Sequence, residues 1–527
     1  MTTRYGDRIL RNIRRAAVAV ALIGAACATG GPASNVGYET DTASRIFARA
    51  YENVVNKYIE PLEPSSFVVA GMGGLAELDA DFHAAMNDGA VLVTHGGTAL
   101  ARLPPPANDD FTGWARLTSQ AIDAGRERSA ALRTASPEDL YKAVLNRALS
   151  KLDRHSRYAG VRSARDYRAR REGFGGIGVR LNFEHGLPQV ISVLPDTPAE
   201  RNRIEAGDVL RQVDGVPLEG LDRNAVIWRL RGDVGSEAVL LVSRKGHPEP
   251  VRITLRRALI VSQTVHVKRE GPLAVISLTG FNQRTARNLN RVLGEINTPK
   301  MPGITGIILD MRGNPGGLLD QAVAVADSFL GRGRIVSTRG RHPDSFQMFN
   351  AGGRDLANGL PLVVLINGQS ASAAEIVAAA LQDQGRAVVV GSNSYGKGTV
   401  QNITRLPNDG ELILTWSRFH APSGYALENL GVMPNFCTSR LSEGKGETLD
   451  AQALRGAIVL TAWRTHSGYD AKSARAMRAR CPGVAEKPDQ DIAIAAVVMA
   501  NKGLYARAVG ASVPSVASSP GPGTAAR

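Results

Sequence analysis

Two serines stand at a turn that could expose a nucleophile. Ser370 and Ser372 lie in NGQSASAAE (367–375), between an apolar run that predicts a buried strand and an Ala-rich run that predicts a helix. A serine before a helix usually caps it, but a strand-to-helix turn of small residues also suits a reactive hydroxyl with backbone N–H groups beside it. The chain has no GxSxG motif, and none of its nine histidines lies close in sequence to this turn. Acyl transfer by a serine therefore needs a base that the fold brings from elsewhere.

Lys397 is the candidate base. It lies between two glycines in VVVGSNSYGKGTV, which predicts a strand followed by a loop. An ordinary lysine has a pKa of about 10.4, and a lysine that acts as a base near neutrality needs a pKa of roughly 7–8. Burial lowers a lysine pKa, and the flanking sequence is apolar or neutral, with no nearby carboxylate to keep the amine charged. The alternative interpretation is a solvated loop lysine.

Three glycine-rich stretches could bind anionic groups. DMRGNPGGLLD (310–320) predicts a strand-to-helix turn with N–H groups that could hold an oxyanion. GFGGIG (173–178) satisfies GxGxxG, but a charged run precedes it and a strand pattern follows, so it does not predict nucleotide binding. GSNSYGK (391–397) resembles a P-loop, yet Gly398 stands where Ser or Thr should hold magnesium. Only the first stretch is expected to support catalysis.

An α/β core must position these residues. GITGIILDM, PLVVLING and RAVVVG predict buried strands without alternation, as expected for a parallel sheet covered on both faces. Helices are predicted over 284–297, over 317–330 and in SAAEIVAAALQDQ, and GTVQNITRL and GELILTWSRFH predict a terminal hairpin. Before the core, alternation of period two with a turn at Asp214-Gly215 predicts a β-rich domain.

Helical segments flank these two domains. Helices are predicted over 40–60, 66–79 and 137–152, and the stretch with ARLPPPANDD between the last two is expected to be irregular. Residues 441–505 are Ala-rich and predicted helical, and the end of the chain is predicted to be a disordered tail.

The N-terminus has the pattern of an export signal. Five arginines in the first 15 residues precede an apolar run of eleven residues, Ala16 to Ala26. A bilayer needs about 20 apolar residues, so this run suits the hydrophobic part of a signal peptide. Lipidation of Cys27 is one outcome, although Leu22 lies five residues before it and a lipobox has its leucine three residues before the cysteine. Ordinary cleavage and an uncleaved anchor remain alternatives. We expect a location in the bacterial periplasm or cell envelope.

Composition excludes several classes of protein. With 527 residues, 43% hydrophobic and 21% charged, the chain can form a sizeable core in several domains, which excludes global disorder, a collagen-like fibre and a disulfide-stapled miniprotein. The net charge is +14, but aromatics are only 5% and the arginines are dispersed, which argues against base-stacking nucleic-acid recognition. The cysteines form no CxxC pair or Cys/His cluster, so no zinc site is expected; Cys437 and Cys481 could pair in an oxidising compartment.

The three catalytic elements, in this order, resemble the C-terminal processing peptidases, also called tail-specific proteases. The matched strings are LDMRGNPGGLL, VLINGQSASAAEIVAAALQD and VVVGSNSYGKGTVQ, and the 25 residues between Ser372 and Lys397 resemble the family's serine–lysine dyad. GFGGIGV, DTPAE, GDVLRQVDG and LRGDVGS resemble its PDZ domain, LDRHSRY resembles the LDPHSxY string before that domain, and WSRFHAPSGYALENLGVMPN resembles its closing hairpin. The match spans most of residues 137–436.

The resemblance implies an α/β fold with a crotonase/ClpP-like protease core, an inserted β-rich PDZ domain and helical N- and C-terminal regions. The expected organisation is 1–36, signal peptide or lipoprotein signal; 37–172, N-terminal helical region; 173–258, PDZ domain; 259–440, serine protease core; 441–505, C-terminal helical region; 506–527, disordered tail.

The resemblance also implies a role for each matched residue. Ser372 would be the nucleophile, Lys397 the general base and Gln401 the residue that orients the lysine, while the N–H groups of Gly317 and Ala373 would form the oxyanion hole. Phe174, Gly175, Gly176, Ile177 and Gly178 match the carboxylate-binding turn of the PDZ domain, and Arg231 matches an arginine that couples PDZ and protease states. No metal or cofactor is implied.

The chain departs from the family pattern at four positions. Gly313 replaces the first Asn of RNNPGG, Arg154 the Pro of LDPHS, Ala374 the second Ser of SASASE and Asn435 the Asp of the closing GVxPD. None removes the dyad. Residues 80–136 and 437–487 have no counterpart that we can place.

The implied function is a serine endopeptidase of the cell envelope that binds protein C-termini through its PDZ domain. Its substrates would be unfolded or flexible protein tails with apolar C-terminal residues, with the PDZ domain gating the site. An activator or adaptor protein, homo-oligomerisation and a membrane tether through the N-terminus stay open, and nucleic acid is not an expected partner. The alternatives are a catalytically silent PDZ scaffold or adaptor of the envelope, and a crotonase-like acyl-CoA enzyme, which would lack a PDZ domain.

Overall fold

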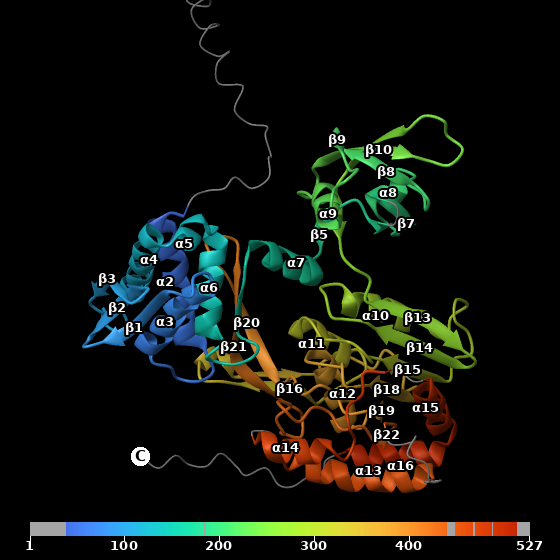
Figure 1. The fold of residues 1–527 in the computed structure, drawn as a ribbon. Coiled ribbons are helices and arrows are strands. Elements are labelled where there is room, and N and C mark those ends of the chain that lie inside the picture. Colours follow the sequence, from blue (N-terminus) through green and yellow to red (C-terminus); the bar gives the residue numbers. More distant parts are fainter. Residues whose placement is uncertain (1–37, 184–185, 440–447, 467–469, 487–488, 514–527) are drawn as a thin grey trace, which may run out of the picture.

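A computed structural model describes residues 38–183, 186–439, 448–466, 470–486 and 489–513 (Figure 1). The predicted export signal, 1–36, lies outside the described residues. Four parts follow one another along the chain: an N-terminal module, a PDZ-like domain, an α/β core and a C-terminal helical layer beneath the core.

The core is a six-stranded sheet whose order is β13-β14-β15-β18-β19-β22. Its strands are β13 (Val265–Glu270), β14 (Leu273–Leu278), β15 (Gly306–Asp310), β18 (Leu362–Ile366), β19 (Val388–Gly391) and β22 (Phe436–Cys437). The pair β13–β14 is antiparallel and the other pairs are parallel. The predicted buried strands are confirmed.

Helices cover both faces of this sheet (Figure 1). On β15, Ile307 and Leu309 pack with α10 (Thr285–Glu295), α11 (Leu319–Asp327) and α12 (Ala373–Asp383). Ile308 faces the other way and packs with α15 (Gln490–Ala500) and α16 (Lys502–Ser512). Alternate residues of one strand are therefore buried on opposite faces, which explains the unbroken apolar runs. Helix α13 (Leu449–Arg464) packs against α16 and β22, and α14 (Ala471–Arg478) follows it.

A second sheet joins the core to the N-terminal module. Its order is β17-β16-β21-β20, from β16 (Arg334–Arg339), β17 (Gln347–Asn350), β20 (Thr399–Arg405) and β21 (Glu411–His420), and β4 (Arg157–Ala159) pairs with β21. The predicted hairpin is β20–β21. Leu406, Leu412 and Leu414 from this hairpin enter the hydrophobic core of the N-terminal module.

The N-terminal module contains a sheet that the sequence analysis missed. Its helices are α2 (Thr40–Lys57), α3 (Pro64–Met72), α4 (Phe111–Arg128), α5 (Ala130–Thr134) and α6 (Pro137–Leu149). The prediction of an irregular stretch between the second and third predicted helices is wrong, because β1 (Phe82–Asn87), β2 (Ala90–His95) and β3 (Thr98–Leu103) form an antiparallel sheet, followed by α4 and α5. Left-handed residues at Asp88-Gly89 and Gly96-Gly97 form the tight hairpin turns.

The PDZ-like domain contains a sheet of order β11-β10-β8-β7-β6 together with helices α8 and α9. Its elements are β5 (Phe174–Gly176), β6 (Val179–Asn182), β7 (Gln189–Val193), α8 (Pro198–Arg201), β8 (Val209–Val213), β9 (Val216–Pro217), α9 (Arg223–Leu230), β10 (Glu237–Ser243), β11 (Val251–Arg256) and β12 (Ala258–Ile260). Strand β6 follows the Phe174–Gly178 turn and lies at an edge of the sheet, where another strand could add. Helix α7 (Val161–Glu172) leads into the domain, which stands off from the core in Figure 1.

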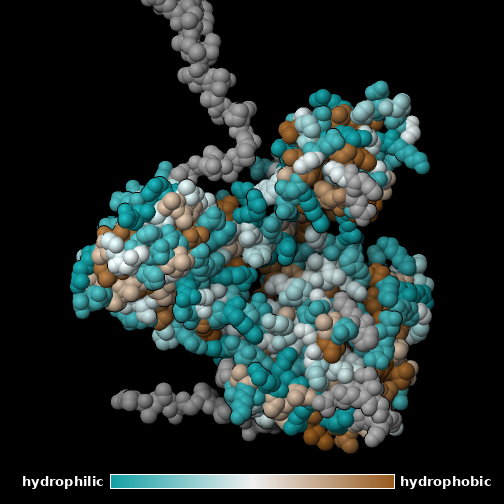
Figure 2. Space-filling view, in the orientation of Figure 1, coloured by the Kyte–Doolittle hydropathy of each residue, from teal (hydrophilic) through white to brown (hydrophobic). Residues whose placement is uncertain are grey.

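The C-terminal layer extends further than expected. Helix α16 ends at Ser512, so the predicted start of the disordered tail at residue 506 is wrong; Ala508 and Ser512 are buried against the core. In Figure 2, hydrophobic residues gather at the end of the molecule where α13 and α16 lie, and Leu454 and Ile458 of α13 are exposed there. Among the described helices no single one is long and apolar enough to cross a membrane, and the bent pair α15–α16 passes by length and composition only.

Candidate active site

Ser372 occupies a strained turn between β18 and α12. It is the N-cap of α12 with φ 56° and ψ −114°, a conformation that costs energy for any residue with a Cβ. The turn is fixed on one side because Ala371 N–H donates to the Asn314 carbonyl at 2.9 Å. Such a sharp strand-to-helix turn presents a serine hydroxyl as a nucleophile elbow does, although GxSxG is absent.

Residues 312–318, here called the glycine turn, lie directly on residues 367–372, here called the serine turn. A Cβ added to Gly316 would lie 2.8 Å from the Ser372 Cβ and 3.0 Å from the Ala373 nitrogen. Phe281 N–H donates to the Gly316 carbonyl at 3.1 Å, and the Phe281 carbonyl accepts from Leu318 N–H at 2.9 Å. The Gly317 N–H takes no part in these two bonds. Of the two predicted oxyanion-hole residues, Ala373 therefore follows Ser372 directly, and Gly317 follows the glycine that packs against Ser372.

Both of these amides are available to a ligand. Ala373 is the first residue of α12, so its N–H has no intrahelical acceptor. No hydrogen bond of the described residues uses the Ala373 or the Gly317 N–H as donor. Fully buried Asn314 holds the turn, since its Nδ2 donates to the Leu278 carbonyl at 2.8 Å and its Oδ1 accepts from Gly316 N–H at 2.9 Å.

Glu375 connects the serine turn to residues 392–398, here called the lysine loop. Its Oε2 accepts from Ser372 N–H at 2.7 Å and from Lys397 N–H at 3.0 Å, and its Oε1 accepts from Ser394 Oγ at 2.5 Å and from Gly396 N–H at 2.6 Å. Burial raises the pKa of this carboxyl, and the four hydrogen bonds oppose that rise. The sequence analysis missed this residue. Its only signal was the Ser-x-x-Glu capping box, which predicts the bond to Ser372 and not the bonds to the lysine loop.

Two glycines shape the lysine loop. Gly396 has φ +86°, and a Cβ on Gly398 would lie 1.8 Å from the Glu428 nitrogen. Burial lowers the pKa of Lys397, the charge of Arg157 lowers it further, and Glu375 raises it. The lowered pKa agrees with the prediction. The expectation of no nearby carboxylate is wrong, because Glu375 approaches from another segment of the chain.

Gln401 does not bind Lys397 in this structure. Its Nε2 donates to the hydroxyls of Thr399 and Thr415, each at 3.1 Å. Its Oε1 is buried and has no partner among the described residues, so it is a free acceptor. The hydrogen bonds of the described residues likewise include none between the Ser372 hydroxyl and the Lys397 amine; such bonds often tighten only when substrate binds.

The LDRHSRY segment lies beside the lysine. Asp153 Oδ1 accepts from the Thr415 hydroxyl at 3.1 Å and from His155 N–H at 2.6 Å. Burial, together with the charge of Lys397, lowers the pKa of His155 to about 4, so this imidazole is neutral near pH 7. The Arg154 guanidinium lies 5.8 Å from the centre of the Tyr395 ring in the lysine loop. The sequence analysis used this segment only as part of the resemblance.

The predicted tail-binding residues form a separate site in the PDZ-like domain. The Gly178 carbonyl accepts from Leu194 N–H at 2.9 Å, while no hydrogen bond of the described residues uses the Ile177 or Gly178 N–H as donor. The Arg231 guanidinium lies 4.3 Å from the centre of the Phe174 ring and pairs with Asp166 at 3.0 Å. Arg231 therefore touches both the predicted turn and helix α7.

Helix α7 is tied to the core on its other side. Arg168 and Arg171 both bind Glu411 Oε1, at 2.9 and 2.8 Å, and Glu411 is buried at the start of β21. Helix α7 therefore ties the PDZ-like domain to the core, in addition to the chain connection from β12 to β13.

The described residues contain one cluster with the ligand types of a metal site. Asp79, Asp81 and His95 lie together in the N-terminal module. Hydrogen bonds account for the cluster, because Asp79 already binds His95 Nε2 at 3.1 Å and the hydroxyl of Ser129. These bonds also lower the pKa of Asp79.

Sequence comparisons define the class of protein. Residues 272–438 match the model of peptidase family S41, and residues 175–255 match that of the PDZ domain. A carboxy-terminal-processing protease of Bartonella bacilliformis is 39% identical over 331 residues, which are 61% of this chain and 76% of that protein. A carboxyl-terminal-processing protease of Picosynechococcus sp. is 32% identical over 261 residues, 49% of this chain and 63% of that protein. The chain therefore belongs to peptidase family S41 and is a serine-type peptidase with a PDZ domain, which confirms the resemblance.

A search of solved structures gives related names. The photosystem II D1 C-terminal processing protease matches with a TM-score of 0.39 and 23% identity, over 75% of this chain and 92% of that one. The PDZ domain of a carboxy-terminal protease from Vibrio cholerae, solved with a peptide, matches 16% of this chain and 96% of its own length, with 26% identity and a TM-score of 0.16.

Proposed function

We propose that this peptidase hydrolyses peptide bonds with Ser372 as nucleophile and Lys397 as general base. The observation that carries the proposal is the carboxylate of Glu375, which binds the backbone amides of both residues. Two loops separated by a helix and a strand are thereby held against one another. The lowered pKa of Lys397 supports the same roles, since a larger fraction of the amine is neutral near pH 7.

The reaction follows from this arrangement. Neutral Lys397 takes the proton of the Ser372 hydroxyl as its oxygen attacks the scissile carbonyl carbon. The negative charge passes to the carbonyl oxygen, which the N–H groups of Gly317 and Ala373 stabilise. Lysine then gives its proton to the leaving amine, and water hydrolyses the acyl-enzyme by the same steps. The free Oε1 of Gln401 is suited to accept from the lysine ammonium and orient it.

The PDZ domain supplies recognition in this proposal. A substrate C-terminus adds as a strand along the open edge of β6, with its carboxylate at the amides of the Phe174–Gly178 turn. Substrates are therefore unfolded or flexible protein tails. Arg231, which contacts Phe174 and pairs with Asp166, is the proposed link between tail binding and the protease core.

We also place the protein in the bacterial envelope. The basic and apolar residues at the N-terminus support export, and the disulfide between Cys437 and Cys481 suits an oxidising compartment. The cysteine pairing that the sequence left open is thus present in the structure.

The test is cleavage of a denatured protein with an apolar C-terminus, together with labelling by a fluorophosphonate. Wild type should cleave and be labelled at Ser372, while Ser372→Ala should do neither. Lys397→Arg is the sharper variant, because arginine keeps the positive charge but cannot be deprotonated. Labelling at Ser370 would contradict the choice of nucleophile. Full activity of Lys397→Arg would contradict the base, and no activity in wild type would favour the silent scaffold.

A further inference from the structure

The C-terminal layer reaches back over the catalytic loops. Residues 478–486, here called the strap, run from the last residue of α14 towards α15 and lie within 437–487, a stretch for which the sequence analysis found no counterpart. Asp491 of α15 and Arg312 of the glycine turn form a buried ion pair at 3.0 Å. The strap therefore lies between α14 and a helix that is itself anchored to the catalytic turn.

The strap holds the segment before the nucleophile. Gly368 N–H donates to the Val484 carbonyl at 2.7 Å, and Asn367 Nδ2 donates to the carbonyls of Ala485 and Glu486 at 2.9 and 3.1 Å. The same Asn367 accepts from Gly313 N–H through Oδ1 at 2.8 Å. One side chain thus joins the strap, the serine turn and the glycine turn.

The strap also holds the lysine loop. Val484 N–H donates to Ser392 Oγ at 3.1 Å. Gly483 packs so closely that a Cβ there would lie 2.7 Å from the Asn393 carbonyl oxygen. Arg478 Nη1 donates to the Leu430 carbonyl at 2.9 Å and would lie 3.0 Å from a Cβ on Gly396. The guanidinium therefore supports the residue next to Lys397.

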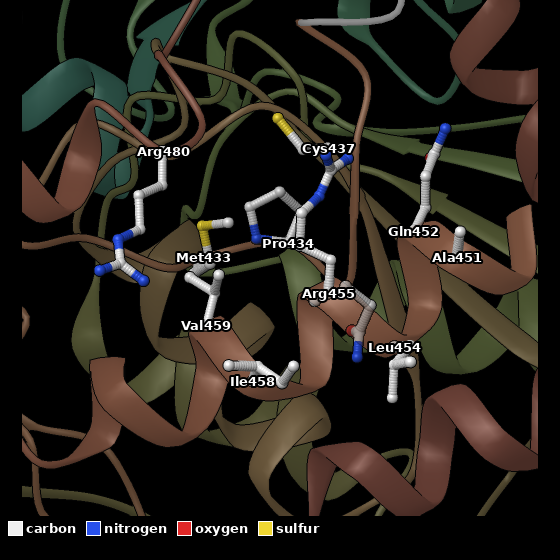
Figure 3. Close-up of a pocket in the computed structure, with 12 residues that line it drawn as sticks. Met433, Pro434, Cys437, Ala451, Gln452, Leu454, Arg455, Ile458, Val459 and Arg480 are labelled. Atoms are coloured by element: carbon white, nitrogen blue, oxygen red, sulfur yellow. The ribbon is translucent and has the colours of Figure 1, made fainter. Parts of the chain in front are cut away.

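A disulfide closes the strap onto the core sheet. Cys481 in the strap is bonded to Cys437 in β22, 44 residues earlier. Cys481 is fully buried, whereas Cys437 is half-buried and lines a pocket of about 520 Å³ between residues 433–437 and α13 (Figure 3). Arg455 and Arg480 line the same pocket.

We propose that the strap positions the catalytic loops and that its disulfide makes peptidase activity depend on oxidation. The inference rests on the proposed serine–lysine function and adds its regulation. An external thiolate bonds to Cys437 Sγ and displaces Cys481 as a thiolate, which is then protonated. A second thiol releases Cys437 as a free thiol and leaves as the external disulfide. The released strap then no longer fixes Asn367, Ser392 and Gly396.

The first experiment compares the oxidised full-length protein with protein reduced by dithiothreitol. Reduction should lower kcat and the fluorophosphonate labelling rate at least about tenfold, as expected when catalytic groups shift by an ångström, with KM unchanged. Reoxidation should restore both. The variant Cys437→Ser/Cys481→Ser should be slow and insensitive to dithiothreitol, which controls for other effects of the reductant. An unchanged kcat after verified reduction would overturn the proposal.

Amide hydrogen exchange in Ser372→Ala measures the effect of the strap independently of catalysis. Reduction should speed exchange at the amides of 367–370 and 392–397, and unchanged rates there would overturn the proposal. If oxidised wild type is inactive while these amides are protected only in the oxidised form, the strap is supported and the serine–lysine assignment fails.

Substitution of Arg478 tests whether this residue of the strap positions the lysine loop. Arg478→Met should lower kcat several-fold at constant KM and change the acid limb of the kcat/KM pH profile, with partial rescue by Arg478→Lys. Arg475→Met, on the exposed side of α14, is the matched control and should leave both unchanged. Equal effects of the two methionine variants would count against the strap.

Discussion

Two glycine turns in this chain present backbone amides, one in the PDZ domain and one in the protease core, and they are built differently. The core turn is fixed by Asn314, by Phe281 and by the serine turn packed on it. The PDZ turn has an open edge strand on one side, and Arg231 lies over its Phe174. An oxyanion hole must be in place before charge develops, whereas a recognition turn needs room for a strand to add. In the function that we propose, the core turn serves catalysis and the PDZ turn serves recognition.

The largest effect is expected at the core turn. Gly317→Ala places a Cβ 2.0 Å from the Phe281 carbonyl oxygen at φ +151°, so the turn must move. Loss of an oxyanion donor costs about 100-fold or more in kcat, and KM for a tail substrate should stay the same. Steady-state kinetics measure both. The control is Gly294→Ala in α10, where a Cβ meets nothing within 4 Å.

A kcat within twofold of wild type for Gly317→Ala would show that this turn is not the oxyanion hole. Circular dichroism and thermal melting of the variant are needed beside the kinetics. A folded variant that still binds tail peptide but does not turn over would establish the division between the two turns.

The next effect is expected at the PDZ turn. Gly178→Ala places a Cβ 2.3 Å from the Thr197 Cβ at φ +90°. We expect KM for a substrate with a free C-terminal carboxylate to rise about tenfold while kcat is retained, because the proposed tail-binding turn and the proposed catalytic residues lie in separate domains. Gly207→Ala in the same domain has a similar φ, +98°, with open space around its Cβ, and controls for backbone strain. An equal loss in both variants would remove the turn from tail recognition.

The sequence allowed both turns to be found but not what holds them. Ser372 and Lys397 stood out because their flanking strings are local and specific. Glu375 was missed because its bonds to the lysine loop cross 19 to 22 residues, which no local pattern encodes. The strap was missed for the same reason, since an Ala-rich helical composition does not tell which surface the connecting segment covers. The N-terminal sheet was missed because FHAAMN and TALARL are weak strand formers, the first packed against α3 and the second against α4.

The pH dependence of kcat/KM tests the role of Lys397 separately from the other residues of the site. Protonated Lys397 cannot act as base, so kcat/KM should fall about tenfold for each pH unit below its lowered pKa. Arg157→Gln removes a positive charge that lowers this pKa, so the acid limb should move to higher pH, and activity at a fixed acid pH should fall a few-fold. His155, with a pKa of about 4, should not govern this limb.

Arg162→Gln, an exposed charge at the start of α7, is the matched control for Arg157→Gln and should leave the profile in place. A shift to lower pH in Arg157→Gln would contradict the sign of this interaction. Tail-peptide binding to the PDZ turn should not change in either variant.

The smallest effect is expected where the two regions meet, at the pair of Arg231 and Asp166. Their side chains are 23% and 47% exposed, so solvent screening limits the pair to about 0.5 kcal/mol, or roughly twofold. A double-mutant cycle with Arg231→Gln and Asp166→Asn, measured separately on kcat and KM, gives the coupling. Coupling in KM alone means that the pair anchors the PDZ turn to α7. Coupling in kcat means that α7, which is bound to Glu411 of β21 through Arg168 and Arg171, transmits tail binding to the protease core.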